Sequence, residues 1–266
     1  MNRKLTGITL LAAVLLTSGC TTLNPKSTTD EDFLVFLLAG QSNMAGRGEV
    51  AEADREIHPR ILMLAQDGSW QPAVDPIHYD KARAGAGLAR SFAEVLADQD
   101  RDITIGLVPA ACGGSPISTW VPGGYHEQTD SHPYDDAIER TRRALQDGRL
   151  AGILWHQGES DSRPQRAALY KENLVELIER FRRDLETPDV PFIIGQLGQF
   201  EGKPWTDARQ QVNQAQIEVA AETPYTAFVS SDGLTAKEDN THFNRESLQE
   251  FGKRYAAAWL EIAEED

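Results

Sequence analysis

The chain has 266 residues, a formal net charge of -15 at pH 7, and 25% charged residues. Because no cluster of Lys or Arg interrupts this acidity, nucleic acid and anionic lipid surfaces are excluded as partners. The composition shows no break after residue 30, so we expect residues 31–266 to form one domain.

The N-terminal segment has the pattern of an export signal followed by a tether. A short basic region precedes an apolar stretch at 8–16, which is too short to span a membrane, and we interpret residues 1–19 as a signal peptide. Cys20, directly after Ser-Gly, resembles the lipidation site of bacterial lipoproteins. This resemblance implies a lipid anchor at Cys20 as the sole membrane contact, a tether over 20–30, and an outer-membrane or cell-surface location. Without the anchor, the protein would be periplasmic or secreted.

After the tether, short apolar runs alternate with amphipathic helical patterns. The apolar runs predict strands at 33–39, 61–64, 103–108, 152–155, 192–197 and 227–230. The helical patterns predict helices at 88–98, 133–146, 165–185, 207–221 and 245–263. Strands that alternate with helices pair in parallel through right-handed crossovers. We therefore expect an α/β fold: a three-layer α/β/α sandwich around a mainly parallel, flavodoxin-like sheet of about five strands.

Four irregular segments follow or lie near the carboxyl ends of predicted strands. They are GQSNMAGRG at 40–48, ACGGSPISTW at 111–120, HQGESD at 156–161 and DNTHFN at 239–244. In a parallel sheet these ends meet at one edge, which is where open α/β proteins place their sites. The sequence therefore predicts a single site built from all four segments.

These segments contain the groups that ester hydrolysis requires. Ser42, on the turn after the first strand, is the candidate nucleophile, and His242 is the candidate base. Asp239 lies three residues before His242 and can reach its Nδ1 atom from the same loop. The three side chains together predict a nucleophile, a base and a group that orients the base.

Donors for the oxyanion are also present. The backbone N–H groups of Ser42 and Gly113 and the side-chain amide of Gln157 are the natural candidates. Gly114 is adjacent to Gly113, and the choice between the two glycines stays open. The histidines lack metal-binding spacing and the chain lacks phosphate-binding loops, so we expect neither a metal nor a nucleotide cofactor.

The four segments, in this order, resemble the SGNH hydrolase superfamily, and within it the sixth carbohydrate esterase family. That family includes acetylxylan esterases, and sialate O-acetylesterases are related to it. The resemblance implies that Ser42, Asp239 and His242 form a catalytic triad, with Gly113 and Gln157 completing the oxyanion hole. It implies a serine esterase that removes acetyl groups from a polysaccharide or oligosaccharide.

Three functions remain to be compared. The tail of GQSNMAGRG resembles the acetylxylan esterase branch of the family, and this resemblance favours acetylxylan as the substrate. An O-acetylated sialic acid is the alternative, and its carboxylate would need an arginine such as Arg47 or Arg83. The third function is carbohydrate binding without cleavage. The residues that contact the sugar are not identified by the sequence.

Three residues in these segments are assigned structural roles. Glu159 and Asp161 resemble the carboxylate pair of a glycosidase, but their spacing just after a strand favours hydrogen bonds that hold the loop. Cys112 lies where an apolar run gives way to glycine, and we expect it to be buried.

Overall fold

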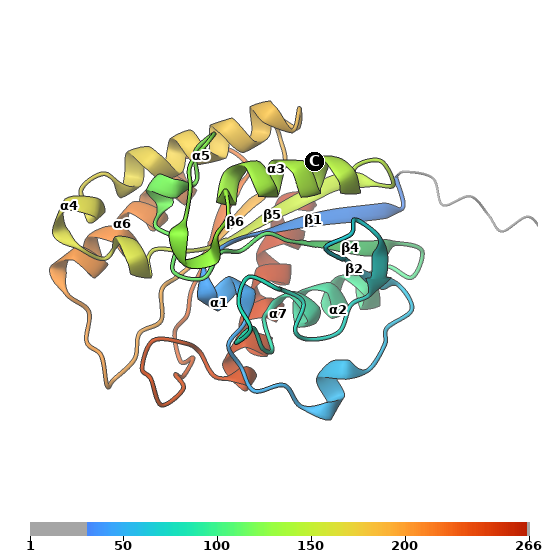
Figure 1. The fold of residues 1–266 in the computed structure, drawn as a ribbon, viewed down its shortest axis with the longest axis horizontal. Coiled ribbons are helices and arrows are strands. Elements are labelled where there is room, and N and C mark those ends of the chain that lie inside the picture. The colour runs from blue at the N-terminus through green and yellow to red at the C-terminus, as the bar shows by residue number, and fades with distance from the viewer. Residues whose placement is uncertain (1–30, 265–266) are drawn as a thin grey trace, which may run out of the picture.

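The computed structural model describes residues 31–264 (Figure 1). The predicted signal peptide, Cys20 and the tether lie outside the described residues. Within them, no helix is long and apolar enough to cross a membrane.

A seven-stranded sheet organises the fold, in the order β3-β2-β4-β1-β5-β6-β7. Its strands are β1 (Phe33–Gly40), β2 (Ile61–Leu64), β3 (Trp70–Pro72), β4 (Thr104–Pro109), β5 (Arg149–His156), β6 (Phe192–Gly195) and β7 (Thr226–Val229). All neighbouring strands are parallel except β3, which pairs antiparallel with β2. This confirms the α/β class and the mainly parallel sheet.

The prediction of about five strands was too low. Each of the six predicted apolar runs forms a strand, and β3 adds a seventh at the edge. With only three residues, β3 is too short to show a periodic pattern. It is held as the return arm of a hairpin, in which Gly68 adopts a φ of 78° and the Ser69 N–H donates to Asp67 Oδ1.

Seven α-helical segments accompany the sheet within residues 31–264. They are α1 (Ser42–Ala45), α2 (Ala89–Gln99), α3 (Pro133–Ala144), α4 (Pro164–Ala167), α5 (Tyr170–Asp184), α6 (Asp207–Glu222) and α7 (Arg245–Ala263). Short 3-10 turns lie at Glu52–Arg55, Ile117–Thr119, Glu127–Thr129 and Glu159–Asp161. The single helix expected over 165–185 is divided into α4 and α5. The division falls next to Leu169, which is 55% exposed, and lets α4 contact α6.

The alternating side chains of β1 divide the core into two layers. Val35 and Leu37 belong to the cluster formed with α3, α5 and α6. Leu34 and Phe36 belong to the cluster formed with α2 and α7. Figure 1 shows α3 and α5 on one face of the sheet and α2 and α7 on the other. Since both faces of β1 are covered, its sequence is apolar at nearly every position.

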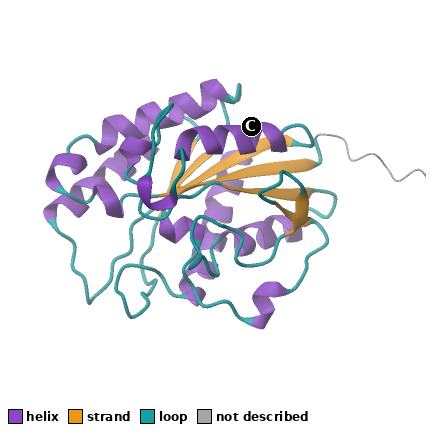
Figure 2. Cartoon of the chain, in the orientation of Figure 1, coloured by secondary structure: helices purple, strands orange, loops and turns teal. Residues whose placement is uncertain are grey.

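The long loops gather at one end of the strands (Figure 2). The segments after β1, β4, β5, β6 and β7 all leave the carboxyl ends of parallel strands, so they meet at one edge of the sheet. The predicted site lies at this edge.

Candidate active site

Close contact between β1 and β5 places Ser42 at the edge of the sheet. Gly40 has a φ of 129°, and a Cβ atom there would collide with the backbone carbonyl of His156. The next residue, Gln41, donates its N–H to the same carbonyl across 2.9 Å. The chain then turns at once into α1, and Ser42 is its first residue.

The structure brings Ser42, His242 and Asp239 together in one hydrogen-bonded chain. Ser42 Oγ lies 2.9 Å from His242 Nε2. On the other side of the ring, His242 Nδ1 lies 2.7 Å from Asp239 Oδ2. The other oxygen of Asp239 accepts the backbone N–H groups of Thr241 and His242, each at 2.9 Å. The carboxylate is therefore fixed by the loop that carries the histidine.

These hydrogen bonds keep Asp239 ionised. Its partial burial acts to raise the pKa of the carboxyl, but the bonds from the His242 ring and from the two backbone N–H groups lower that pKa to about 2. An ionised Asp239 favours a proton on Nδ1 of His242, which leaves Nε2 as the acceptor facing Ser42. The three side chains therefore form a relay, Asp239–His242–Ser42, in which His242 can take the proton of the serine hydroxyl.

Asn43, which follows the serine, holds the histidine loop in place. Its Nδ2 donates to the carbonyl of Thr241 at 3.2 Å, and its Oδ1 accepts the N–H of Phe243 at 3.1 Å. These are the two residues on either side of His242. The sequence reasoning missed this role, since asparagine has no acid or base chemistry, although its position within GQSNM was a signal.

A cavity of about 430 Å³ opens over Ser42 and His242. Its cationic lining residues are Arg83, Arg163, Lys203 and Arg209. Among the described residues that line it, the only carboxylate is Glu159. Arg209 is buried, and this burial lowers the pKa of its guanidinium while Glu159 raises it. A chain of net charge -15 therefore has a cationic pocket at this point.

Gly113 does not present a free N–H to this cavity, contrary to the expectation. Its N–H donates to Asp80 Oδ2 at 2.8 Å. The same oxygen forms a buried ion pair with Arg47, also at 2.8 Å. The neighbouring glycine, Gly114, lines the cavity and has a φ of 91°. Asp80, the partner of Gly113, lies in a different loop, and no spacing in the sequence predicts that the two residues meet.

Gln157 also differs from its predicted role. The side chain is fully buried, does not line the cavity, and has its Nε2 within hydrogen-bond distance of three protein acceptors. These are Asp161 Oδ2 at 2.5 Å, the Ser115 carbonyl at 3.0 Å and Gln41 Oε1 at 3.2 Å. Because Asp161 also accepts the Ile117 N–H, the two side chains join the segments after β1, β4 and β5. The loop-holding role expected for Asp161 is confirmed.

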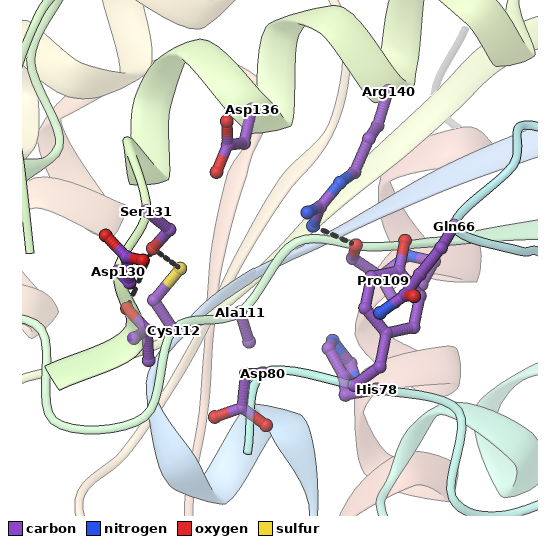
Figure 3. Close-up of a pocket in the computed structure, with 12 residues that line it drawn as sticks. Gln66, His78, Asp80, Pro109, Ala111, Cys112, Asp130, Ser131, Asp136 and Arg140 are labelled. Carbon is purple, nitrogen blue, oxygen red and sulfur yellow. Dashed lines mark hydrogen bonds between the residues drawn. The ribbon is translucent and has the colours of Figure 1, made fainter.

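A second cavity, of about 340 Å³, lies beside the loop after β4 (Figure 3). Cys112 lines it with its Sγ 3.5 Å from Ser131 Oγ. Cys112 is buried, as predicted, and this burial raises the pKa of its thiol. Across residues 31–264, no group of three or more His, Cys, Asp or Glu side chains is placed to hold a metal ion.

Of the two arginines considered for binding a substrate carboxylate, only Arg83 lines the catalytic cavity. Arg47 is buried and engaged with Asp80, as described above.

The parallel sheet, with a serine, a histidine and an aspartate joined at its carboxyl edge, defines the class: an ester hydrolase of the SGNH type. Comparison with known families then identifies the group within this class. The chain belongs to the family of carbohydrate esterases described as sialic acid-specific acetylesterases, whose sequence profile matches residues 32–261.

Two curated proteins show the range of the similarity. A probable carbohydrate esterase of Arabidopsis thaliana is 32% identical over 247 residues, which cover 85% of this chain and 90% of that protein. A probable 9-O-acetyl-N-acetylneuraminic acid deacetylase of Escherichia coli is 27% identical over 202 residues, covering 58% of this chain and 61% of that protein. The crystal structure of the Arabidopsis thaliana protein superposes with a TM-score of 0.76 at 29% identity, covering 87% of this chain and 98% of that one.

Proposed function

We propose that the protein is a serine O-acetylesterase whose substrate is an O-acetylated sugar that carries a carboxylate, of the sialic acid type. The observation that carries this proposal is the hydrogen-bonded chain Asp239–His242–Ser42, whose serine and histidine line a cavity together with four cationic side chains. The relay supports the reaction, and the cations support the choice of sugar.

The reaction begins when Ser42 Oγ bonds to the acetyl carbonyl carbon while His242 Nε2 takes the hydroxyl proton. The carbonyl π electrons move onto its oxygen. When the tetrahedral intermediate collapses, the bond to the sugar oxygen breaks and His242 returns the proton to that oxygen. Water then attacks the acetyl-enzyme by the same route and releases acetate and Ser42. Asp239 stays ionised and stabilises the His242 imidazolium throughout.

The oxyanion needs donors that are not already bound within the protein. Ser42 is the first residue of α1, so its N–H has no acceptor within that helix. Gly114 lines the cavity, whereas the Gly113 N–H is bound to Asp80. We therefore assign the oxyanion to the N–H groups of Ser42 and Gly114 in place of Gly113 and Gln157.

The cationic lining favours an acidic sugar over acetylxylan, the substrate that the sequence pattern favoured. A carboxylate in the cavity would find Arg83 and Lys203 at its mouth and the buried Arg209 deeper inside. The name of the Escherichia coli relative, a deacetylase of 9-O-acetyl-N-acetylneuraminic acid, agrees with this choice. The chain as a whole is acidic, but in the lining of this cavity four cationic side chains face a single carboxylate, Glu159.

The test measures acetate release from O-acetylated N-acetylneuraminic acid and from acetylxylan at matched concentrations of acetyl groups. We expect the higher kcat/KM on the acetylated sialic acid, and no release from either by Ser42→Ala. A higher kcat/KM on acetylxylan would reject the acidic substrate and leave the esterase intact. Binding of either sugar by the wild type with no acetate release would support the non-catalytic alternative.

We also propose that the protein is exported and anchored through a lipid on Cys20. The support is the sequence alone: a basic region, an apolar stretch at 8–16, and Ser-Gly before Cys20. In cells of a bacterial host, the wild type is expected in the membrane fraction and Cys20→Ala in the soluble exported fraction. Equal partitioning of the two would reject the anchor.

A further inference from the structure

A second hollow adjoins the catalytic cavity. It has a volume of about 400 Å³ and shares Gly114, Ser160 and Arg163 with that cavity. Both volumes fall within the range of about 300–1,000 Å³ that is typical of small-molecule sites. Because three residues line both spaces, the catalytic cavity and the hollow are immediate neighbours.

Hydrogen bonds fix the boundary between the two spaces. Ser160 Oγ donates to the Gly114 carbonyl at 2.8 Å, and Arg166 Nη1 donates to the Ser160 carbonyl at 2.9 Å. Gly114 has a positive φ, and a Cβ atom there would lie 3.0 Å from Gln128 Oε1, a residue that lines the hollow. A side chain at this position would therefore be strained by the backbone conformation and would crowd Gln128.

The lining of the hollow is polar and carries both positive and negative charges. Arg163 and Arg166 supply guanidinium groups, Glu127 a carboxylate and Gln128 an amide, and all four side chains lie on exposed residues. Planar groups of this kind, donors and acceptors together, suit the hydroxyl groups of a sugar. They do not suit an apolar acyl chain.

We propose that this hollow binds the saccharide unit next to the acetylated sugar, so that the enzyme prefers acetyl esters within a glycan to those on a free monosaccharide. The inference rests on the proposed function. An acetyl group bound at Ser42 is too short to reach from the catalytic cavity into the hollow. The part of the substrate that reaches the hollow is therefore the remainder of the glycan.

The test compares acetate release from matched pairs of substrates: O-acetylated N-acetylneuraminic acid and its lactoside, and acetylated xylose and xylobiose. For the pair that the enzyme accepts, we expect the wild type to show a kcat/KM about tenfold higher on the linked sugar, which corresponds to about 1.4 kcal/mol. Glu127→Trp, which fills the hollow from an exposed position, should remove this preference. It should leave the rates on the monosaccharide and on p-nitrophenyl acetate unchanged.

Two further variants control the experiment. Gln128→Ala removes a polar contact without adding bulk and should lower the preference for the linked sugar. Glu261→Trp places the same bulk on exposed surface near the end of α7 and should behave like the wild type.

Equal rates on free and linked sugars in the wild type would overturn the inference while the proposed function stands. If Glu127→Trp lowered only the rates on p-nitrophenyl esters with longer acyl chains, the hollow would be assigned to the acyl group. That result would also overturn the inference. The absence of acetate release from every sugar would reject the proposed function and the inference with it.

Discussion

Asn43 donates through Nδ2 to Glu159 Oε1 across 2.6 Å. This bond fixes the orientation of the amide, whose other contacts reach the backbone on both sides of His242. Glu159 is nearly buried, and its carboxylate also lies 3.8 Å from His156 Nε2. The residue after the nucleophile is thus oriented by the segment that follows β5, and it in turn positions the base.

Replacing Asn43 tests this relationship. Asn43→Ala frees the loop around His242, and because small misplacements of a base cost catalysis strongly, we expect kcat to fall about 10²-fold while KM changes little. Steady-state kinetics on p-nitrophenyl acetate measure both constants. Glu159→Gln keeps one acceptor oxygen and should lose less. If the fall in rate matches the fraction of unfolded protein, Asn43 has only a general structural role.

Gln157→Ala separates a structural role from an oxyanion role. Removing the side chain leaves Asp161 and the Ser115 carbonyl buried with fewer partners, so we expect the free energy of unfolding to fall by about 1–3 kcal/mol. Urea denaturation measures this loss. A true oxyanion donor would instead cost about 10²–10³-fold in kcat. Such a loss without destabilisation would restore the role predicted from the sequence.

Several parts of the molecule were predictable because local signals dominate them. The expected helix at 245–263 coincides with α7, whose start is marked by the N-cap Asn244, and the expected strand at 61–64 coincides with β2. The proximity of Ser42, His242 and Asp239 was predictable from one rule: the loops at the carboxyl ends of parallel strands meet at one edge of the sheet.

The rest depends on contacts distant in sequence. Gly113 is bound by Asp80, 33 residues earlier, and Gln157 by partners in the segments after β1, β4 and its own strand. No periodic pattern in the sequence indicates any of these partners. The cationic lining likewise combines single residues from separate loops, and the acidic composition of the chain conceals it.

Asp75 should make stability depend on pH. Burial and the nearby Asp54 carboxylate raise the pKa of Asp75 to about 7, so between about pH 4 and pH 7 the folded protein keeps a proton that the unfolded chain releases. Stability should therefore fall as the pH rises through this window. Asp75→Asn should remove this part of the slope, a difference on the order of 2–4 kcal/mol between pH 4 and pH 8.

Urea denaturation at several pH values measures the slope for Asp75→Asn and the wild type. Asp98→Asn, at an exposed position, is the matched control and should follow the wild-type curve. Parallel curves for Asp75→Asn and the wild type would show that Asp75 does not titrate in this range.

Arg83→Gln tests the cationic pocket. Removing one positive charge from the lining should raise KM for an acetylated sialic acid several-fold at low salt, and the effect should shrink as salt screens the charge. KM for p-nitrophenyl acetate, which is neutral, should not change. Arg101→Gln removes an exposed charge before β4 and serves as the control. An equal effect of Arg83→Gln on both substrates would argue against a carboxylate in the pocket.

The most direct measurement of the central claim is mass spectrometry of the enzyme quenched during turnover of an acetylated sugar, combined with acetate release by Ser42→Ala. We predict an acetyl group on the peptide that contains Ser42, no such adduct in Ser42→Ala, and no acetate released by that variant while it remains folded. Wild-type turnover by folded Ser42→Ala would contradict the claim.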